Sequence, residues 1–325
     1  MLLLVKIILE LSLMLSTWLL NFFCFAFLIC SFLTHADNER SKIDEETCFS
    51  NSWNKEKLLD LKNNQFLLSN QGIHELLPQL RYCLASSDPI IRDDVAFGAY
   101  STWLRAGNIR PPTLSSLFET FLSDIDHNKN DEQSVFLPFA ILVFSEVLRV
   151  DRKSPYLQAS QRIKAVNALS SYMLLANDYR GFDDQLGWRH SVAHTSDAIF
   201  QLVLNPKINQ AQLQQMLNAI AQQIPAQGSH FYIYAEPERL SRPVYYAMRR
   251  EDVPIKFWEQ WISNIADPSP FKSWAEVFTN QQGLAQRHNV KLFLLNLQYF
   301  IVAGKGNEQL GELNIMVKDA LKSMI

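Results

Sequence analysis

Apolar side chains recur at spacings of three and four through most of this chain, which is the spacing that lines one face of an α-helix. Glycine is scarce, at 10 of 325 residues, and most prolines stand at the edges of the apolar segments. The pattern therefore predicts an almost entirely helical body. The predicted helices lie near residues 53–63, 72–86, 89–106, 113–125, 132–149, 155–177, 187–204, 209–224, 236–249, 254–266, 271–280, 284–303 and 307–324.

Two segments need a separate interpretation. Residues 230–234 are the one candidate strand, and we expect them to form an extended loop that leads into the helix near residue 236. Residues 290–302 are strongly apolar, but they are short and include Lys291. They therefore indicate a buried C-terminal helix and not a membrane span.

Helices of similar length joined by short turns predict an all-α fold of stacked antiparallel helix pairs. The Asp88-Pro89 pair, followed by apolar residues and Arg92-Asp93, resembles the start of a HEAT-type repeat helix. No clean repeat period of about 40 residues is visible, so the expected array is a degenerate HEAT-like α-solenoid. A globular helical bundle is the alternative.

The N-terminal segment differs from the rest of the chain. Residues 11–33 are almost continuously apolar, and Lys6 is the one basic residue before them. This predicts that residues 1–36 are a signal peptide cut after Ala36. The run is also long enough to cross a bilayer, so an uncleaved N-terminal anchor is the alternative. In both cases residues 37–325 should form one helical domain outside the cytoplasm, either periplasmic or extracellular, that touches the membrane only through this segment if it is uncleaved.

Charge limits the partners of the exported part. The leader holds one base and one acid, so 29 Lys and Arg (30 − 1) remain against 32 Asp and Glu (33 − 1), a net charge of −3. A chain this close to neutral has no electrostatic reason to bind nucleic acid. Two cysteines remain, Cys48 and Cys83, which form one disulfide in an oxidising compartment or stay as two separate buried thiols.

The candidate chemistry lies in residues 178–182 and 187–197. The second segment reads Gly-Trp-x-His-x-x-Ala-His-x-x-Asp and puts His190, His194 and Asp197 at positions i, i+4 and i+7. At about 100° per residue these side chains fall within an arc of about 60° on a helix. Apolar residues occupy the opposite side, so we expect the His/Asp stripe to face solvent or a groove.

Two imidazoles and a carboxylate on one face are a partial ligand set for a divalent metal such as Zn, with a position left for water. Ser191 stands where the general base of an HExxH motif would be, so the metalloprotease motif is absent. Two alternatives are open. The stripe could bind an organic or peptide ligand, or it could be a structural polar network that fixes the preceding loop.

Several flanking residues are further binding candidates. Asp178 and Arg180 could fold over the first turn of the helix, where Arg180 suits a carboxylate or phosphate. The structural alternative is an ion pair of Arg180 with Asp183, Asp184 or Asp197. Trp188 either walls a pocket or packs under the helix.

A second polar group follows near residue 236. It consists of His230, Glu236, Glu238 and Arg239. Glu236 or Glu238 could supply a general base or another metal ligand. The alternative is that these acids favour the positive N-terminal end of their helix, with Arg239 paired to one of them. Asp93 and Asp94 could line the same groove or lie on a solvated helix face.

The motif at 187–197, preceded by an Arg-Gly-aromatic turn at 180–182, resembles the hallmark of the bacterial domain-of-unknown-function family 2785 (DUF2785). Several shorter segments also resemble that family at the positions where it would have them, so the resemblance covers roughly residues 80 to 260. They are Asp88-Pro89, Ile91-Arg92-Asp93, Trp103, Ser134-Val135-Phe136 and Glu236-x-Glu238-Arg239-Leu240. The chain departs from the family at Leu137-Pro138, where an Arg-Ser pair is expected. The resemblance implies an all-helical, repeat-like fold and no established activity.

Two classes of function remain. The first is an extracytoplasmic scaffold whose groove, centred on His190, His194 and Asp197, binds a protein, peptide or envelope component. The second is a metal-dependent, hydrolase-like enzyme that uses those three residues as ligands and a glutamate as base. We favour the scaffold because no complete catalytic set is readable.

Overall fold

The structure is a computed structural model that describes residues 45–49, 52–128, 133–304 and 308–324. All the helices given below belong to one unit, residues 43–325. The expected leader, residues 1–36, lies outside the described residues. None of the described helices is long and apolar enough to span a bilayer.

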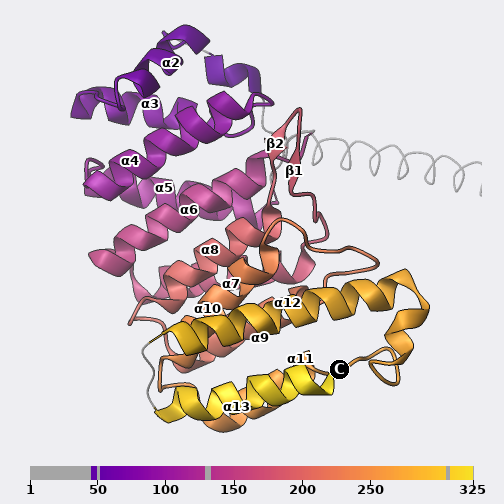
Figure 1. Cartoon of the computed structure of the whole chain (residues 1–325). Helices are drawn as coiled ribbons and strands as arrows, with labels where there is room; N and C mark the ends of the chain where they lie inside the picture. The colour runs from indigo at the N-terminus through magenta and orange to yellow at the C-terminus, as the bar shows by residue number, and fades with distance from the viewer. Residues whose placement is uncertain (1–44, 50–51, 129–132, 305–307, 325) are drawn as a thin grey trace, which may run out of the picture. The chain divides into compact units, whose positions relative to one another are not determined.

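Helices dominate the described chain, which confirms the prediction of an all-α fold (Figure 1). The elements are η1 (Glu45–Phe49), α2 (Lys55–Asn63), α3 (Asn70–Cys83), the π-helix η2 (Ile90–Phe97), α4 (Gly98–Ala106), α5 (Pro111–Asp126), α6 (Phe136–Lys153), α7 (Ala159–Leu175), β1 (Phe182–Asp183), β2 (Gly187–Trp188), α8 (Ser191–Val203), α9 (Gln210–Gln223), α10 (Glu236–Met248), α11 (Ile255–Ile265), η3 (Glu276–Thr279), α12 (Gln281–Ala303) and α13 (Glu308–Ser323).

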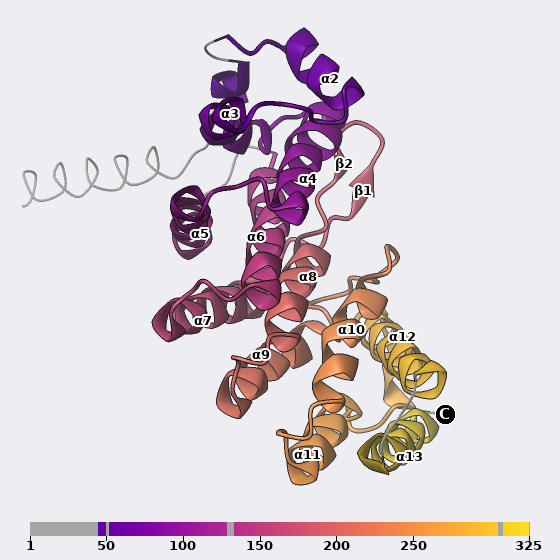
Figure 2. The ribbon, with the colours of Figure 1, turned by 90° about the vertical axis from the view of Figure 1, so that its left-hand side faces the viewer.

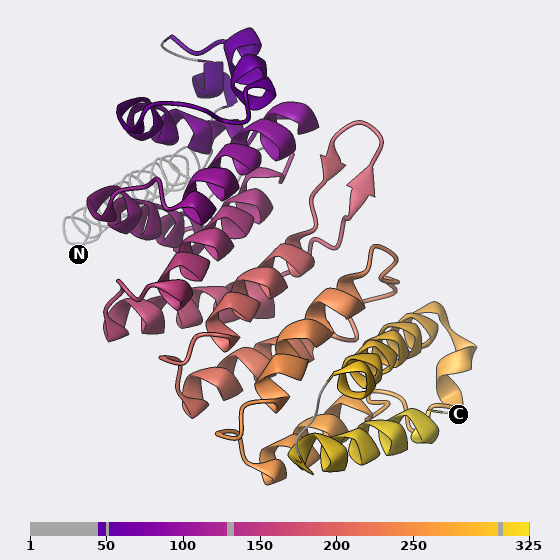
Figure 3. The same cartoon turned by 60° about the vertical axis from the view of Figure 1, so that its left-hand side comes forward.

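The helices from α4 onward stack in two rows (Figure 2). Row A consists of α4, α6, α8, α10 and α12, and row B of α5, α7, α9, α11 and α13. Each helix contacts the next helix of its own row, and α5 with α6 and α7 with α8 also contact across the rows. Short connections lead from row A to row B, whereas longer ones, residues 176–190, 224–235 and 266–280, return the chain to row A (Figure 3). The predicted stacking of helix pairs is therefore present.

Local sequence explains where many helices begin and end. The side chains of Asn54, Ser69 and Asn280 accept hydrogen bonds from the first turns of α2, α3 and α12. Proline opens α5, where its missing N–H removes no helix hydrogen bond. Gly107 ends α4 with a φ of 75°, a left-handed conformation that glycine adopts without steric cost.

Two predicted helices were wrong in part. The helix expected over 187–204 starts only at Ser191, because Gly187 and His190 have positive φ angles of 67° and 57°. The preceding residues form a small antiparallel hairpin in which Phe182 pairs with Trp188. The helix expected over 271–280 is replaced by turns and the short 3-10 helix η3.

Cys48 and Cys83 are joined by a disulfide, with their Cα atoms 4.6 Å apart. The bond resolves the choice between a disulfide and two thiols. It joins η1 to the end of α3 across a sequence separation of 35 residues. A loop of that length corresponds to about 4 kcal/mol of stabilisation, through the entropy that the crosslink removes from the unfolded chain.

Candidate functional site

The sequence motif lies where the N-terminal ends of three row A helices meet the β1–β2 hairpin. Each of these helices is entered through a non-glycine residue with left-handed backbone: Ser134 before α6, His190 before α8 and Ala235 before α10, with φ angles of 58°, 57° and 66°. Such conformations cost of order 1 kcal/mol or more and persist only where the surroundings hold them. Three of them at one end of a row indicate a strongly constrained region.

His190 connects the hairpin to α10. Its Nε2 lies 2.9 Å from the carbonyl oxygen of Tyr234 and 3.6 Å from Oε1 of Glu236. Because a carbonyl only accepts, Nε2 carries the proton of the neutral imidazole. The ring also stacks on Trp188, with centroids 4.5 Å apart. His190 is therefore held by three groups from two segments that are far apart in sequence.

The glycines of the motif allow the hairpin to pack closely. A Cβ atom on Gly181 would lie 2.0 Å from the ring of Tyr234, a distance that no packed structure accommodates. Gly187 has a positive φ, and a Cβ there would lie 3.1 Å from Pro89 and 3.2 Å from Arg92. These contacts explain why both positions are glycine.

Arg92 hydrogen-bonds to the hairpin from the side opposite Tyr234. Its guanidinium is fully buried and donates to the carbonyls of Leu186 at 2.7 Å and Ser86 at 3.1 Å. Its Nε lies 2.7 Å from Asp93, in an ion pair whose angles do not fit a hydrogen bond. Burial raises the pKa of Asp93 to about 6, although the positive charge of Arg92 opposes that rise.

His194 presents one nitrogen to the surface. Its Nδ1 lies 3.2 Å from the carbonyl oxygen of Pro138 and must donate to it, so the neutral ring has its lone pair on Nε2. Among the described residues nothing bonds to Nε2, and this atom is not one of the buried unpartnered ones, so it reaches solvent. Burial, together with the charges of His190 and Arg239, lowers the pKa of His194 well below its usual value.

Asp197 forms an ion pair with Arg239 of α10. Burial raises the pKa of Asp197, and the guanidinium opposes this rise. Ser196 also donates to the main-chain carbonyl of Arg239, at 2.8 Å. The sequence suggested an acid of the same helix as the partner of Arg239, but the structure has an interhelical pair with Asp197 instead.

The expectation of an open His/Asp stripe was wrong. His190 and His194 are only 8% and 6% exposed, because α8 lies between α6 and α10 in the middle of row A. The Asp197–Arg239 pair is partly exposed, and His194 reaches the surface at Nε2. His190 points instead at the entry to α10.

The predicted metal ligands are engaged with protein groups. His190 faces Tyr234, His194 uses Nδ1 on Pro138, and Asp197 is paired with arginine. Within the ranges that the structure describes, no group of three or more His, Cys, Asp and Glu side chains is placed to hold a metal ion. The geometry therefore gives the three-ligand zinc site no support.

The flanking candidates separate into different clusters. Arg180 pairs with Asp178 at 2.8 and 2.5 Å, an acid that the sequence had not suggested as its partner. Burial opposes ionisation of Asp178, but its hydrogen bonds from Arg180 together lower its pKa. His230 stacks on Tyr179 with centroids 5.0 Å apart, and burial lowers its pKa.

The two glutamates of α10 have different roles. Glu236 is 2% exposed, accepts from the backbone N–H of Tyr234 at 2.9 Å, and faces His190 as the sequence suggested. Glu238 pairs with Arg242 on its own helix at 2.8 Å, away from both histidines. Glu236 thus belongs to the junction around His190, and Glu238 belongs to an ion pair within α10.

Sequence reasoning missed Tyr234, Pro138 and Phe139 as parts of this site. Tyr234 supplies the carbonyl for His190 and the ring against Gly181. Phe139 contacts the ring of His194 edge-on at 5.1 Å and lies under Arg92, 4.7 Å from its guanidinium. Pro138 contributes its main-chain carbonyl, which every residue carries, so no sequence signal could have revealed this contact.

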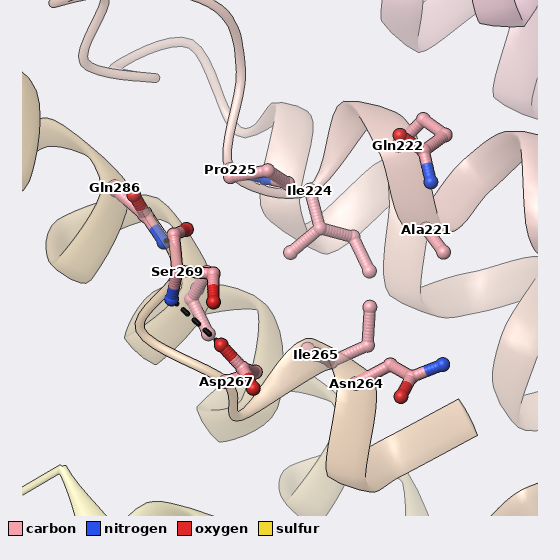
Figure 4. A pocket seen from close by; sticks show the side chains of 10 residues that line it. Ala221, Gln222, Ile224, Pro225, Asn264, Ile265, Asp267, Ser269 and Gln286 are labelled. Atoms are coloured by element: carbon pink, nitrogen blue, oxygen red, sulfur yellow. Dashed lines mark hydrogen bonds between the residues drawn. The ribbon is translucent and has the colours of Figure 1, made fainter. Parts of the chain in front are cut away.

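Cavities lie beside the motif and away from it. One of about 470 Å³ opens between α5, α7 and the start of α8, where Tyr172 and Ser191 share a hydrogen bond of 2.8 Å. Another, of about 380 Å³, lies at the ends of α9 and α11 and is lined by amides and apolar side chains together with Asp267 and Ser269 (Figure 4). The second has no lining residue from the motif.

Comparison with known proteins identifies the family. The family described as "Protein of unknown function (DUF2785)" matches residues 122–299, which are 178 of the 325 residues. The chain belongs to this family. The match runs from α5 to α12, so it starts later and ends later than the resemblance read from residues 80 to 260. No curated protein and no solved structure matches the chain.

DUF2785 membership leaves the role of the motif to be argued from its contacts. The match covers the hairpin and four successive row A helices, α6, α8, α10 and most of α12. It excludes the Asp88-Pro89 segment and the disulfide, which lie before residue 122. The motif is thus central to the matched region.

We expect Gly181→Ala to lower the free energy of unfolding by about 1–3 kcal/mol, because the added methyl overlaps the ring of Tyr234. The loss should shrink in a Tyr234→Ala background. Gly311→Ala is the matched control: its Cβ meets nothing within 4 Å in α13, and helix propensity predicts a gain of about 0.5–1 kcal/mol. Chemical denaturation checks all three, and equal effects at Gly181 and Gly311 would refute the packing explanation.

Acidification should destabilise the wild type through His194. Its depressed pKa means that below about pH 6.5 the unfolded chain binds a proton that the folded chain does not. Stability is then fully present above that pH and falls by up to about 1.4 kcal/mol per unit on descent. His194→Asn keeps a donor for Pro138 without titrating, so its stability should fall less between pH 7 and 5. Denaturation curves that show the same loss of stability between pH 7 and 5 for the two proteins would contradict this assignment.

Proposed function

We propose that this DUF2785 protein is an exported α-helical binding scaffold that holds its partner on the outward face of row A. That face, called the row A face below, is formed by Glu146 and Arg149 of α6, His194, Asp197 and Gln201 of α8, and Arg239, Arg242 and Tyr246 of α10. Six of these side chains are partly exposed, whereas those of Glu146 and His194 are buried.

The surface nitrogen of His194 carries this proposal. The ring is fixed by Pro138 and Phe139, so its lone pair on Nε2 has a defined direction before any partner arrives. An acceptor held in place in this way adds little entropy cost to binding. Beside it, the Asp197–Arg239 pair offers both an acceptor and a donor.

Perturbed titration supports a site at the same place. Burial raises the pKa values of Asp93 and Asp197 against the opposing charges of Arg92 and Arg239, and burial together with nearby positive charge lowers the pKa of His194. Groups with shifted pKa values cluster at functional sites more often than elsewhere. The clustered left-handed residues at the same helix ends are a second, independent sign.

Export rests on two features. The first is the apolar segment within residues 1–36, and the second is the disulfide between Cys48 and Cys83, a bond typical of oxidising compartments. We therefore expect mature protein with an intact mass that begins at Asp37 and with no thiol available to an alkylating reagent. A full-length mass in the membrane fraction would favour the uncleaved anchor, and alkylated cysteines in cytosolic protein would oppose export altogether.

A photo-crosslinking amino acid tests the binding surface. Placed at Gln201 on the row A face in exporting cells, it should yield a discrete adduct, whereas placement at the exposed Lys164 of α7 in row B should not. Replacing both members of the Asp197–Arg239 pair by alanine should reduce the Gln201 adduct about tenfold, because their contacts with the partner are lost. Replacing both residues together leaves no unpaired charge that could disturb the fold.

Two results would count against the proposal. Equal adducts from Gln201 and Lys164 would show that row A is not the binding face. Stoichiometric zinc in the purified protein, lost in folded His190→Ala and His194→Ala variants, would favour the metal-dependent hydrolase instead.

A further inference from the structure

The row A face carries positive charge that the described residues do not neutralise. Arg105, Arg239 and Arg242 are paired with Glu146, Asp197 and Glu238. Three other arginines have no carboxylate partner in the part of the chain that the structure describes: Arg149 and Arg152 of α6 and Arg249 at the end of α10.

Arg149 and Arg152 lie close enough for their positive charges to repel each other. Burial and the charge of Arg149 both lower the pKa of Arg152, whose Nε donates to Gln201 at 3.1 Å. Arg149 donates to no described group. Arg250 provides the contrast, because it donates to the carbonyls of Val203, Asn205 and Ile208 and so serves the fold.

Aromatic side chains continue the surface from these arginines toward α12. Phe200, beside Gln201, packs on Tyr246 with centroids 5.0 Å apart, and Arg249 lies over the Tyr246 ring at 5.6 Å. Tyr245 stacks on Phe300, which contacts Tyr299. Tyr299 and Val302 are 67% and 66% exposed, so the apolar end of this strip is open to solvent.

We infer that this strip, from Arg149 and Arg152 across α8 to Arg249 and Tyr299, docks an acidic polypeptide segment that also carries apolar side chains. This inference rests on the proposed function, since it names the class of partner for the row A face. Each guanidinium can take a carboxylate through paired N–H donors, and the exposed aromatic rings suit apolar side chains.

The mixture of cations and open aromatics favours a polypeptide over a uniformly polar anionic polymer. A polysaccharide or nucleic acid would use the arginines but leave Val302 without a matching group. Adjacent helices lie about 8–10 Å apart, so the path from α6 to α12 spans roughly 24–30 Å. An extended segment of about 8 residues covers that distance.

The test uses a fluorescein-labelled peptide of about 12 residues, long enough for the path, with glutamate at alternate positions and leucine or tyrosine between them. Fluorescence anisotropy with the mature protein should show salt-sensitive binding. The matched peptide with glutamine for every glutamate should bind at least about tenfold more weakly, because charge-assisted contacts are lost.

Variants locate the binding. Arg149→Ala with Arg152→Ala should weaken binding of the glutamate peptide by about tenfold or more, and Tyr299→Ser should weaken it while leaving the fold unchanged at an exposed position. Arg149→Lys with Arg152→Lys should keep most of the affinity, since the charge remains. Lys164→Ala in row B is the control and should have no effect.

The inference is overturned if the glutamate and glutamine peptides bind alike, or if Lys164→Ala weakens binding as much as the arginine variants do. It is also overturned if heparin binds through Arg149 and Arg152 while the peptide does not, which would point to an anionic polysaccharide. A Gln201 crosslink without peptide binding would leave the scaffold proposal standing and remove only this partner class.

Discussion

The contact on which the motif region depends is the hydrogen bond from Nε2 of His190 to the carbonyl of Tyr234. It holds a residue with left-handed backbone at the start of α8 and fixes the loop that begins α10. Because Trp188 stacks on the same ring and Gly181 packs on Tyr234, the hairpin, α8 and α10 constrain one another. The orientation of His194, one turn further along, follows from this arrangement.

The motif thus combines two roles that its sequence does not separate. His190, Gly181 and Gly187 build the junction, and their partners are main-chain carbonyls and packed rings. His194 is fixed by the same junction yet keeps one nitrogen at the surface. The residues that carry the family resemblance therefore mainly build this junction.

The periodic pattern of apolar residues was sufficient to predict most of the helices and their stacking in pairs. It failed at residues 187–190 because local periodicity does not register two positive φ angles, which Gly187 and His190 adopt under tertiary contacts with Arg92, Pro89 and Tyr234. It also failed at 271–280, where Trp274 folds back to donate to Ala266 at 2.9 Å and turns replace the helix. At 187–190 contacts from distant parts of the sequence override helix propensity, and at 271–280 a contact with the end of α11, eight residues away, does so.

By itself the sequence determined the all-α class, the stacked helix pairs and the family, because these depend on periodicity and short motifs. Only the tertiary structure decided that His190 faces Tyr234, that Asp197 pairs with Arg239 across two helices, and that Cys48 meets Cys83. The reason is physical: each of these partners lies at least 35 residues away in sequence, and only packing of the rows brings them within bonding distance.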